Sequence, residues 1–203
     1  MHAFTIQELQ SWERFTRAHF LNSLSGFKSA SLVATINKEG LPNLALFSNI
    51  VHLGADPALV GMVNRPREAA PHTLSNIEAT EAFTINLFTR SMIRQAHQTS
   101  AKYPAEVSEF EATGLTPEWH PACQAPFVQE SPVKYALKLK EIIPIQWNST
   151  FFIIGEIQLV LADERLLQPD GFLALEQAGV VTSLGIDGYY STQLEERLPY
   201  AKP

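Results

Sequence analysis

Three short clusters carry the polar side chains of this chain that are best suited to hold a charged small molecule. They are Ser48-Asn49, Arg65 followed by His72-Thr73, and the run from His97 to Tyr103 (HQTSAKY). Small polar residues between apolar segments can turn backbone N–H groups toward a ligand. A guanidinium pairs bidentately with phosphate oxygens. These residue types therefore suit a pocket edge and one bound phosphate group.

Each cluster also has a simpler structural explanation. Ser48-Asn49 could be an ordinary turn, and Arg65 a solvated strand end. His72-Thr73 could cap a helix, and His97 could lie at the negative end of a helix dipole. Taken singly, the structural explanation is the stronger one for each cluster, and spacing alone does not show that the three meet in space.

Familiar catalytic motifs are absent from the sequence. There is no GxGxxG after the first expected strand, no GxxxxGK[ST], no HExxH and no GxSxG. The six histidines lack metal-ligand spacing, so no metal site is expected. The single cysteine, Cys123, excludes an internal disulfide and a cysteine-rich zinc site. Any redox chemistry is therefore expected to come from an organic cofactor.

Composition and charge exclude further classes. The chain has 203 residues, of which 45% are hydrophobic and 18% charged. A chain of this size and composition can form a full hydrophobic core without disulfides or structural metal ions. A formal net charge of −6 argues against a nucleic-acid partner or an anionic membrane surface. The first residues, MHAFTIQELQSWERF, show no basic leader followed by an apolar run, and no window is long enough for a membrane span. The expectation is a cytoplasmic protein.

The elements that must position the clusters are mostly strands. A capping box, Thr5 with Glu8, predicts a helix that runs to about Phe15, and residues 1–25 read as an N-terminal helical extension. Strands are predicted at Ala30–Asn37, Leu44–Phe47, Ile50–Leu53, Leu59–Val63, Glu81–Phe88, Val133–Ile145 and Thr150–Leu161. Short helices are predicted at Pro71–Ile77, Ser91–Gln98, Val107–Thr113 and Phe172–Ala178.

The order of these elements indicates the fold class. Hairpin connections without regular strand–helix alternation favour a mainly β protein, an antiparallel barrel decorated with helices, over a doubly wound sheet. The proline-rich passage from Pro117 to Pro132 is predicted to be a surface excursion in which Trp119, Phe127 and Val128 still need somewhere to pack. One domain spanning 1–203 is expected.

Several long runs of the sequence resemble one known family. The run from Gly26 to Ile77, GFKSASLVATINKEGLPNLALFSNIVHLGADPALVGMVNRP…HTLSNI, is similar to the flavin reductase-like, FMN-binding split-barrel family. So are HQTSAKYPAEVSEFEATGLTP (His97 to Pro117), APFVQESPVKYALKL (Ala125 to Leu139) and FFIIGEIQLV (Phe151 to Val160). The runs follow the family's order and extend to the Tyr189-Tyr190 tail, which makes the resemblance more specific than any single motif.

The resemblance implies a six-stranded antiparallel split barrel and a homodimer that holds FMN near the subunit interface. By position, the ring system would be lined by Phe47, Ser48, Asn49 and Ile50. The phosphate end would be held by Arg65, His72, Thr73 and Ser100, in a loop shaped by Gln98, Thr99, Ala101 and Tyr103. Lys28 is a weaker candidate for an anionic partner.

One position departs from the family pattern. Many members carry a lysine and an aspartate just before the threonine that corresponds to Thr73, whereas this chain has Pro71 and His72. We therefore expect Arg65, with His72, to balance the phosphate charge.

The reaction that the resemblance implies is hydride transfer from NADH or NADPH to the flavin, followed by electron delivery to an acceptor. The absence of a Rossmann motif fits a nicotinamide that stacks transiently on an exposed flavin face. No side chain is predicted to be catalytic. Two alternatives stay open: an FMN-binding electron carrier that acts with a protein partner, and an oxidase of the pyridoxamine-phosphate type. A barrel with an empty pocket is the remaining structural explanation.

Overall fold

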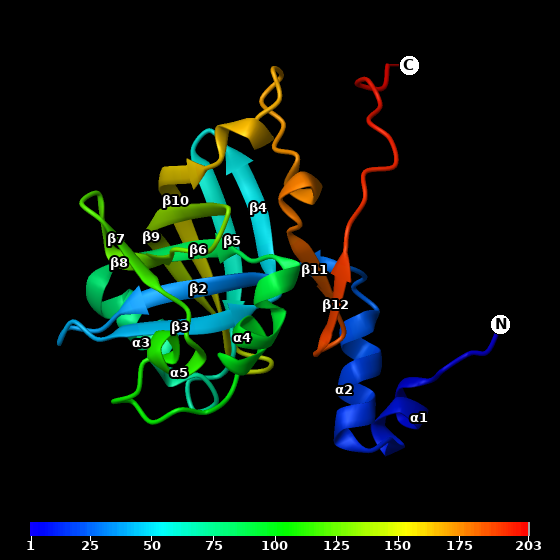
Figure 1. Cartoon of the computed structure of the whole chain (residues 1–203). Coiled ribbons are helices and arrows are strands. Elements are labelled where there is room, and N and C mark those ends of the chain that lie inside the picture. Colours follow the sequence, from blue (N-terminus) through cyan, green and yellow to red (C-terminus); the bar gives the residue numbers. More distant parts are fainter. Residues whose placement is uncertain (203) are drawn as a thin grey trace.

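An antiparallel sheet that curls into an open barrel forms the centre of the computed structural model, which describes residues 1–202 (Figure 1). Its strand order is β3-β2-β6-β9-β10-β5-β4, and every pairing is antiparallel. The strands are β2 (Ser31–Ile36), β3 (Pro42–Phe47), β4 (Ile50–Ala55), β5 (Ala58–Asn64), β6 (Ala82–Leu87), β9 (Val133–Ile145) and β10 (Thr150–Ala162).

The barrel is split between two strands that follow each other in the chain. β3 and β4 are joined by Ser48-Asn49, yet they form the two edges of the sheet. The first predicted cluster therefore bridges the opening of the barrel. The mainly β class and the split barrel are confirmed, but the count of six strands is wrong for this sheet. All seven strands predicted from the residue pattern belong to this sheet, because the short apolar strand β4 pairs with β5.

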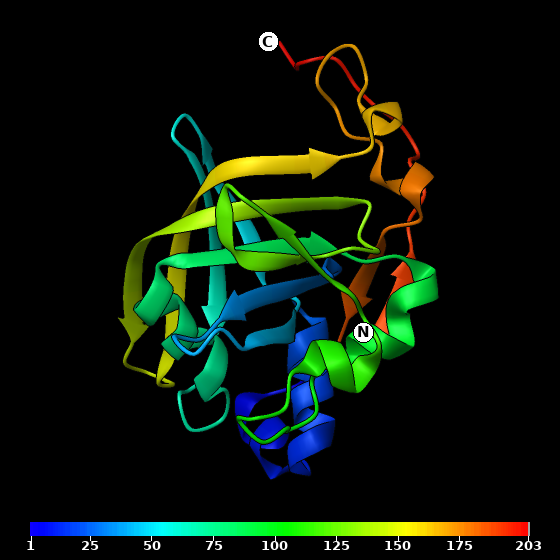
Figure 2. The same cartoon turned by 60° about the vertical axis from the view of Figure 1, so that its left-hand side comes forward.

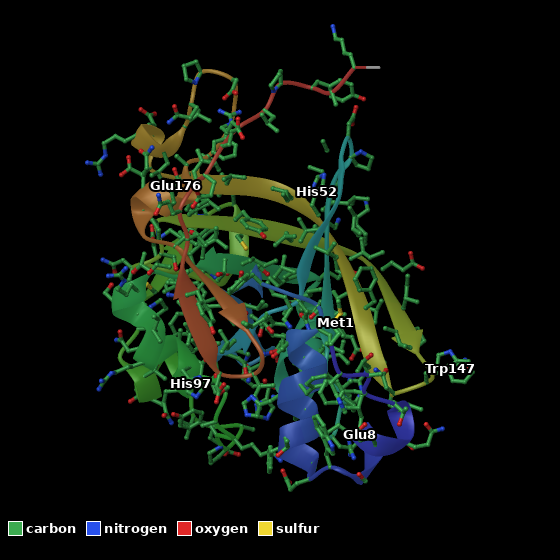
Figure 3. The ribbon with its side chains drawn as sticks, turned by 90° about the vertical axis from the view of Figure 1, so that its right-hand side faces the viewer. Met1, Glu8, His52, His97, Trp147 and Glu176 are labelled. Carbon is green, nitrogen blue, oxygen red and sulfur yellow. The ribbon has the colours of Figure 1, made fainter. Side chains whose placement is uncertain are left out.

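The two long predicted strands, β9 and β10, pair as a hairpin. Its register shifts between Ile154 and Gly155, where a bulge increases the local twist. Gly155 is required at this point, because an added Cβ would lie 2.6 Å from Cζ of Phe83 on β6. Trp147, at the tip of this hairpin, points away from the barrel (Figure 3).

Two apolar clusters hold the sheet from its two faces. One cluster joins Val33, Met62, Phe83 and Ile153 of the barrel to Leu74 and Ile77 of helix α3 (Pro71–Thr80). The other joins Leu32 and Ala34 to the elements that cover the outer face of β2. These elements are η1 (Arg90–Met92), α4 (Ile93–Gln98), α5 (Glu109–Thr113) and β8 (Cys123–Val128). β2 is therefore buried on both faces, which explains its nearly continuous apolar sequence.

The predicted proline-rich excursion is an ordered hairpin of β7 (Pro117–His120) and β8. Phe127 and Val128 are fully buried, as expected, but Trp119 is 52% exposed, so the prediction that it packs inside is wrong. The hairpin lies against β6, where the side chain of Asn86 accepts a hydrogen bond from the Val128 N–H at 2.9 Å. The hairpin therefore meets buried polar groups on β6, beside its apolar contact with β2 through Val128.

The N-terminal extension contains two helices where one was predicted. α1 (Ile6–Ser11) begins at Thr5, whose hydroxyl accepts the Glu8 N–H as the capping box predicts. It ends at Ser11, and Glu13 caps a new helix, α2 (Arg14–Ser23), through the backbone N–H groups of Phe15 and Thr16. No residue of α2 is buried, and both helices lie outside the barrel (Figure 2).

The C-terminal segment returns to the barrel opening as a small second sheet. Two strands of this sheet, β11 (Val181–Leu184) and β12 (Gly188–Ser191), follow the 3-10 turns η2 (Glu164–Leu166) and η3 (Leu175–Ala178). The third strand, β1 (Lys28–Ser29), comes from the start of the chain and pairs with β11. η3 lies within the predicted helix Phe172–Ala178 but is shorter. Among the described residues, no helix has the length and apolar character needed to cross a membrane.

Candidate cofactor site

A cleft of about 780 Å³ lies at the opening of the barrel and brings the three predicted clusters together. Ten of the twelve predicted site residues line it: Phe47, Ser48, Asn49, Arg65, His72, Thr73, Thr99, Ser100, Ala101 and Tyr103. The other two, Ile50 and Gln98, are not in its lining. Gln98 instead supports a lining residue, since its Nε2 donates to the Tyr103 hydroxyl at 3.1 Å. That these residues bind a cofactor stays a prediction.

The Ser48-Asn49 link is fixed across the opening of the barrel. Asn49 Oδ1 accepts the backbone N–H of Val63 on β5 at 3.3 Å, and the Ile50 N–H donates to Ser29 Oγ at the same distance. Phe47, just before the link, packs into the core of the barrel. The link is therefore a tethered edge with a polar rim and an apolar base.

One end of the cleft, which we call the α3 end, surrounds the first turn of α3. Its members are Asn43, Asn64, Arg65, Ala69 to Thr73, and Glu109. α3 starts with Pro71 at its first position, and its N-cap, Ala70, has no side chain that could accept a hydrogen bond. The backbone N–H groups of His72 and Thr73 consequently have no intrahelical acceptor. Free N–H groups and the positive end of a helix dipole favour an anion here.

Two arginines of the loop before α3 differ in what they contact. Arg67 forms a two-pronged ion pair with Glu78 on α3, at 2.9 and 2.7 Å. This bond raises the pKa of Arg67 and lowers the pKa of Glu78. Arg65 lines the cleft and has no ion-pair partner within residues 1–202. Of these two cations, Arg65 is the one available to a ligand.

Two buried asparagines hold the α3 end in place, and no sequence pattern had distinguished them. Asn43 on β3 donates to Thr73 Oγ1 at 3.3 Å. Asn64, at the end of β5, donates through Nδ2 to the carbonyls of Arg65 and Ala70, at 2.8 and 3.3 Å. Its Oδ1 is buried and has no partner within the described part of the chain.

The α3 end also contains a buried carboxylate. Glu109, the first residue of α5, is only 6% exposed and accepts the Leu44 N–H at 2.9 Å. Burial raises the pKa of Glu109, while the hydrogen bond from Leu44 and the nearby His72 act in the opposite direction. In the sequence Glu109 is one glutamate in an acidic helix, so nothing there indicated a place in the cleft.

The 97–103 loop forms part of the wall of the cleft, but most of its hydrogen-bond donors are used within the loop and α4. The side-chain hydroxyls of Thr99 and Ser100 donate to the carbonyls of Ala96 and His97 at 2.8 and 2.6 Å. The backbone N–H groups of Thr99, Ser100 and Ala101 also bond to the last carbonyls of α4. The structural explanation from the sequence, a helix C-terminus running into a loop, thus describes this cluster, even though the cluster also lines the cleft.

The other end of the cleft, which we call the hairpin end, consists of Asn22, Ser183 and the turn Gly185–Tyr189. The Tyr189 hydroxyl hydrogen-bonds His97 Nδ1 at 2.8 Å, and burial, followed by the charge of Asp187, raises the pKa of Tyr189 to about 12. His97 lies beside this hairpin in Figure 3. The sequence indicated only a tail with Tyr189-Tyr190 here, because the contact between residues 97 and 189 is set by tertiary structure.

Lys28, the weaker candidate, lies outside the lining of the cleft. Its Nζ donates to the carbonyl of Asn22 at 2.6 Å and to Ser25 Oγ at 2.9 Å. A lysine at this position satisfies the C-terminal end of α2. Lys28 therefore anchors the N-terminal extension.

Fold and site together define a class: split-barrel proteins with a cleft at the opening of the barrel. The family model described as "Flavin reductase like domain" matches residues 25–177. A crystal structure from Shewanella frigidimarina, of a protein assigned as a flavin reductase with a split barrel domain, is 48% identical to this chain. It superposes with a TM-score of 0.95 and covers 99% of this chain and 100% of the other. The chain belongs to the flavin reductase-like family.

Two further relatives are more distant. The flavoredoxin of Desulfovibrio vulgaris (Miyazaki F) is 25% identical, with a TM-score of 0.76 over 87% of this chain and 92% of its own. An uncharacterised protein of Aquifex aeolicus is 29% identical over 155 residues, which are 75% of this chain and 78% of the relative.

Proposed function

We propose that this protein is an FMN-dependent oxidoreductase in which NADH or NADPH reduces the flavin. The observation that carries the proposal is the α3 end. Free backbone N–H groups and Arg65, which has no ion pair within residues 1–202, line the same cleft as the Ser48-Asn49 link. Membership of the flavin reductase-like family, and the 48% identical Shewanella relative, support a flavin as the ligand.

The residues of the cleft fit a flavin mononucleotide. The N–H groups of His72 and Thr73 and the guanidinium of Arg65 form a donor set for a phosphate dianion. The Ser48-Asn49 link would hold the ring system with backbone groups, over the apolar base that Phe47 provides. Because Ala70 leaves the helix donors free, no side chain has to be displaced when the phosphate binds.

Bound flavin supplies the group that accepts the hydride. The chain contributes binding and orientation: the α3 end fixes the phosphate, and the tethered link fixes one edge of the ring. The hairpin end provides the opposite wall, against which a nicotinamide would be placed.

We also propose that the protein is a homodimer with the cleft near the interface. β4 is an edge strand beside the split, and its Val51 and Leu53 are 44% and 42% exposed. Trp147, at the tip of the β9–β10 hairpin, is 99% exposed, and its neighbour Asn148 lines the cleft. Exposed apolar side chains around a cleft favour burial against a second copy.

The first test of the function is a visible absorbance spectrum of the purified protein before and after FMN is added. A flavin spectrum that stays with the protein through gel filtration supports the proposal, and a colourless protein that does not retain FMN contradicts it. Anaerobic stopped-flow mixing of the loaded protein with NADH or NADPH then follows flavin bleaching. Fast bleaching with one nucleotide supports the reductase. Slow bleaching with both supports an electron carrier, the function that the name of the flavoredoxin relative suggests.

A further inference from the structure

We propose that Asn64 is a positioning residue of the phosphate site: it holds the 65–70 loop so that Arg65 and the first turn of α3 face the cleft. The inference rests on the proposed function, because it concerns how the same cleft holds the phosphate of FMN. Asn64 does not have to touch the cofactor to do this.

The position of Asn64 is fixed by the barrel. It is the last residue of β5, pairs with Phe151 of β10 in the ladder, and is completely buried. From this rigid point its Nδ2 donates to the carbonyls of Arg65 and Ala70, the first and last residues of the loop. One amide group therefore closes the loop at both ends.

The orientation of this amide is determined by its surroundings. If the side-chain oxygen and nitrogen exchanged places, the oxygen would face two carbonyls and no donor would remain there. The buried Oδ1 is left without a partner in the described residues, which is unfavourable, and the two bonds of Nδ2 offset this. The contribution of Asn64 therefore comes from its Nδ2 group, which donates both hydrogen bonds.

Asn64 fixes the start of α3, because the N-cap residue Ala70 has no side chain that could do so. A serine or aspartate at the N-cap would accept the N–H of the second or third helical residue and fix the start of α3 in that way. It would also use a donor that a phosphate needs. Asn64 instead fixes the helix start through the Ala70 carbonyl, so the N–H groups of His72 and Thr73 stay free.

The second anchor of the loop is exposed. Arg67 binds Glu78 in a pair whose side chains are 42% and 40% exposed, and it lies over the Phe151 ring at 5.4 Å. Exposed ion pairs contribute little. The loop is also closed by its own backbone, because the N–H groups of Ala69 and Ala70 donate to the Pro66 carbonyl at 2.8 and 3.1 Å. Of the two side-chain anchors, the buried amide is the stronger, and it fixes the backbone of Arg65 through its carbonyl.

The test compares Asn64→Leu with Asn76→Leu. Asn76 is also a buried amide that ties α3 to the sheet, by donating to Thr35 Oγ1 at 3.0 Å, but it lies in the middle of the helix. Each variant is titrated with FMN and with riboflavin, which lacks the phosphate, by flavin fluorescence. For Asn64→Leu we expect the Kd for FMN to rise about tenfold, because a loop that is no longer held would misplace one hydrogen bond to the charged phosphate. The Kd for riboflavin should stay unchanged within twofold. For Asn76→Leu we expect a lower Tm and the wild-type ratio of the two Kd values.

The outcomes separate this inference from the proposed function. A wild-type protein that binds neither flavin contradicts the function. A wild-type protein that prefers FMN, with the same preference in Asn64→Leu, contradicts only the role of Asn64, as does an equal loss of preference in both variants. If Asn64→Leu does not fold, Asn64→Ser keeps one hydroxyl donor. It is expected to reduce the preference for FMN two- to fivefold, and an unchanged preference in this variant contradicts the inference.

Discussion

The two ends of the cleft are built in different ways. At the α3 end, buried side chains on separate strands, Asn43 and Asn64, hold the first turn of a helix whose N–H groups and neighbouring Arg65 are left unpaired. At the hairpin end, the turn of the β11–β12 hairpin is joined to α2 and α4 by two side-chain contacts, both partly exposed. These are His19–Asp187 at 3.7 Å and Tyr189–His97 at 2.8 Å. In Figure 1, α3 lies to the left of β3 and the hairpin to the right of α4.

The difference indicates a division of labour. A preorganised end avoids an ordering cost each time a group binds, so it suits a cofactor that is retained. An end held by exposed contacts can adjust, so it suits a substrate that enters and leaves in every turnover. We therefore expect changes at the α3 end to alter FMN affinity, and changes at the hairpin end to alter the KM of the electron donor.

The largest effect is expected for Arg65→Gln, with Arg67→Gln as its matched control. Arg65 lines the cleft without an ion pair, whereas Arg67 is two residues away and bound to Glu78. A hydrogen bond to a charged group contributes about 1.5–3 kcal/mol, so Arg65→Gln is expected to raise the Kd for FMN about 10- to 100-fold at low salt. Arg67→Gln should change it less than about twofold, with a stability loss below about 1 kcal/mol. Fluorescence titration at two salt concentrations measures both.

An unchanged FMN affinity in Arg65→Gln at low salt would show that the helix N-terminus alone holds the phosphate. Equal losses of FMN affinity in the two variants would show instead that binding depends only on the total positive charge of the loop. Either result removes the contrast between the paired and the unpaired arginine.

A second prediction concerns the buried carboxylate of the α3 end. Because burial raises the pKa of Glu109 in the folded state, its favourable contribution is fully present below its unfolded pKa and is lost as pH rises through its folded pKa. Burial therefore makes Glu109 less favourable to the folded state at higher pH than at lower pH. Glu109→Gln, which keeps an acceptor for the Leu44 N–H, is expected to raise the free energy of unfolding at pH 7 by an amount on the order of 1 kcal/mol.

The pH dependence distinguishes this effect from simple repacking. Urea unfolding from pH 4 to pH 8 should show the advantage of Glu109→Gln disappearing toward pH 4. Glu78→Gln on α3 should behave in the opposite sense, because Arg67 lowers the pKa of Glu78, and its contribution is present at neutral pH and lost as pH falls. An advantage of Glu109→Gln that is equally large at pH 4 would contradict the explanation.

The two ends also differ in how far they could be predicted from sequence. Apolar runs and turn residues located all seven barrel strands within a few residues, because the period of a strand is visible locally. Arg65 and His72-Thr73 stood out as polar residues beside a strand end and a helix start, but their assignment to one phosphate site came from the family resemblance. Asn64 and Glu109 were missed because an asparagine at a strand end and a glutamate in a helix are common, and only long-range contacts make these two special.

The hairpin end was missed for the same reason. Asp187 and Tyr189 are far from His19 and His97 in sequence, and no local pattern links them. The break between α1 and α2 is a milder case: the periodic residues continue past Trp12, but the side chain of Glu13 caps a second helix and stops the first from extending.

A third prediction tests the hairpin end through Tyr189→Phe. This variant removes the hydroxyl that bonds His97 and keeps the ring. A typical hydrogen bond contributes about 0.5–1.5 kcal/mol, so we expect the KM for the nicotinamide donor to rise about two- to fivefold while the Kd for FMN stays unchanged. Steady-state kinetics and FMN titration on the same preparation measure the two quantities. A tenfold loss of FMN affinity without a change in KM would place the cofactor at the hairpin end and reverse the comparison.

The smallest effect is expected for Asp187→Asn. The side chains of the His19–Asp187 pair are 45% and 61% exposed, and His19 attracts the carboxylate only when it is protonated. Exposed pairs of this kind contribute less than about 1 kcal/mol and are screened by salt. The variant should therefore change the KM of the donor less than about twofold and only at low salt, with no effect on FMN binding. Because this contact and Tyr189–His97 hold the same turn, a larger change in KM for Asp187→Asn than for Tyr189→Phe would mean that α2, rather than α4, sets the width of the cleft.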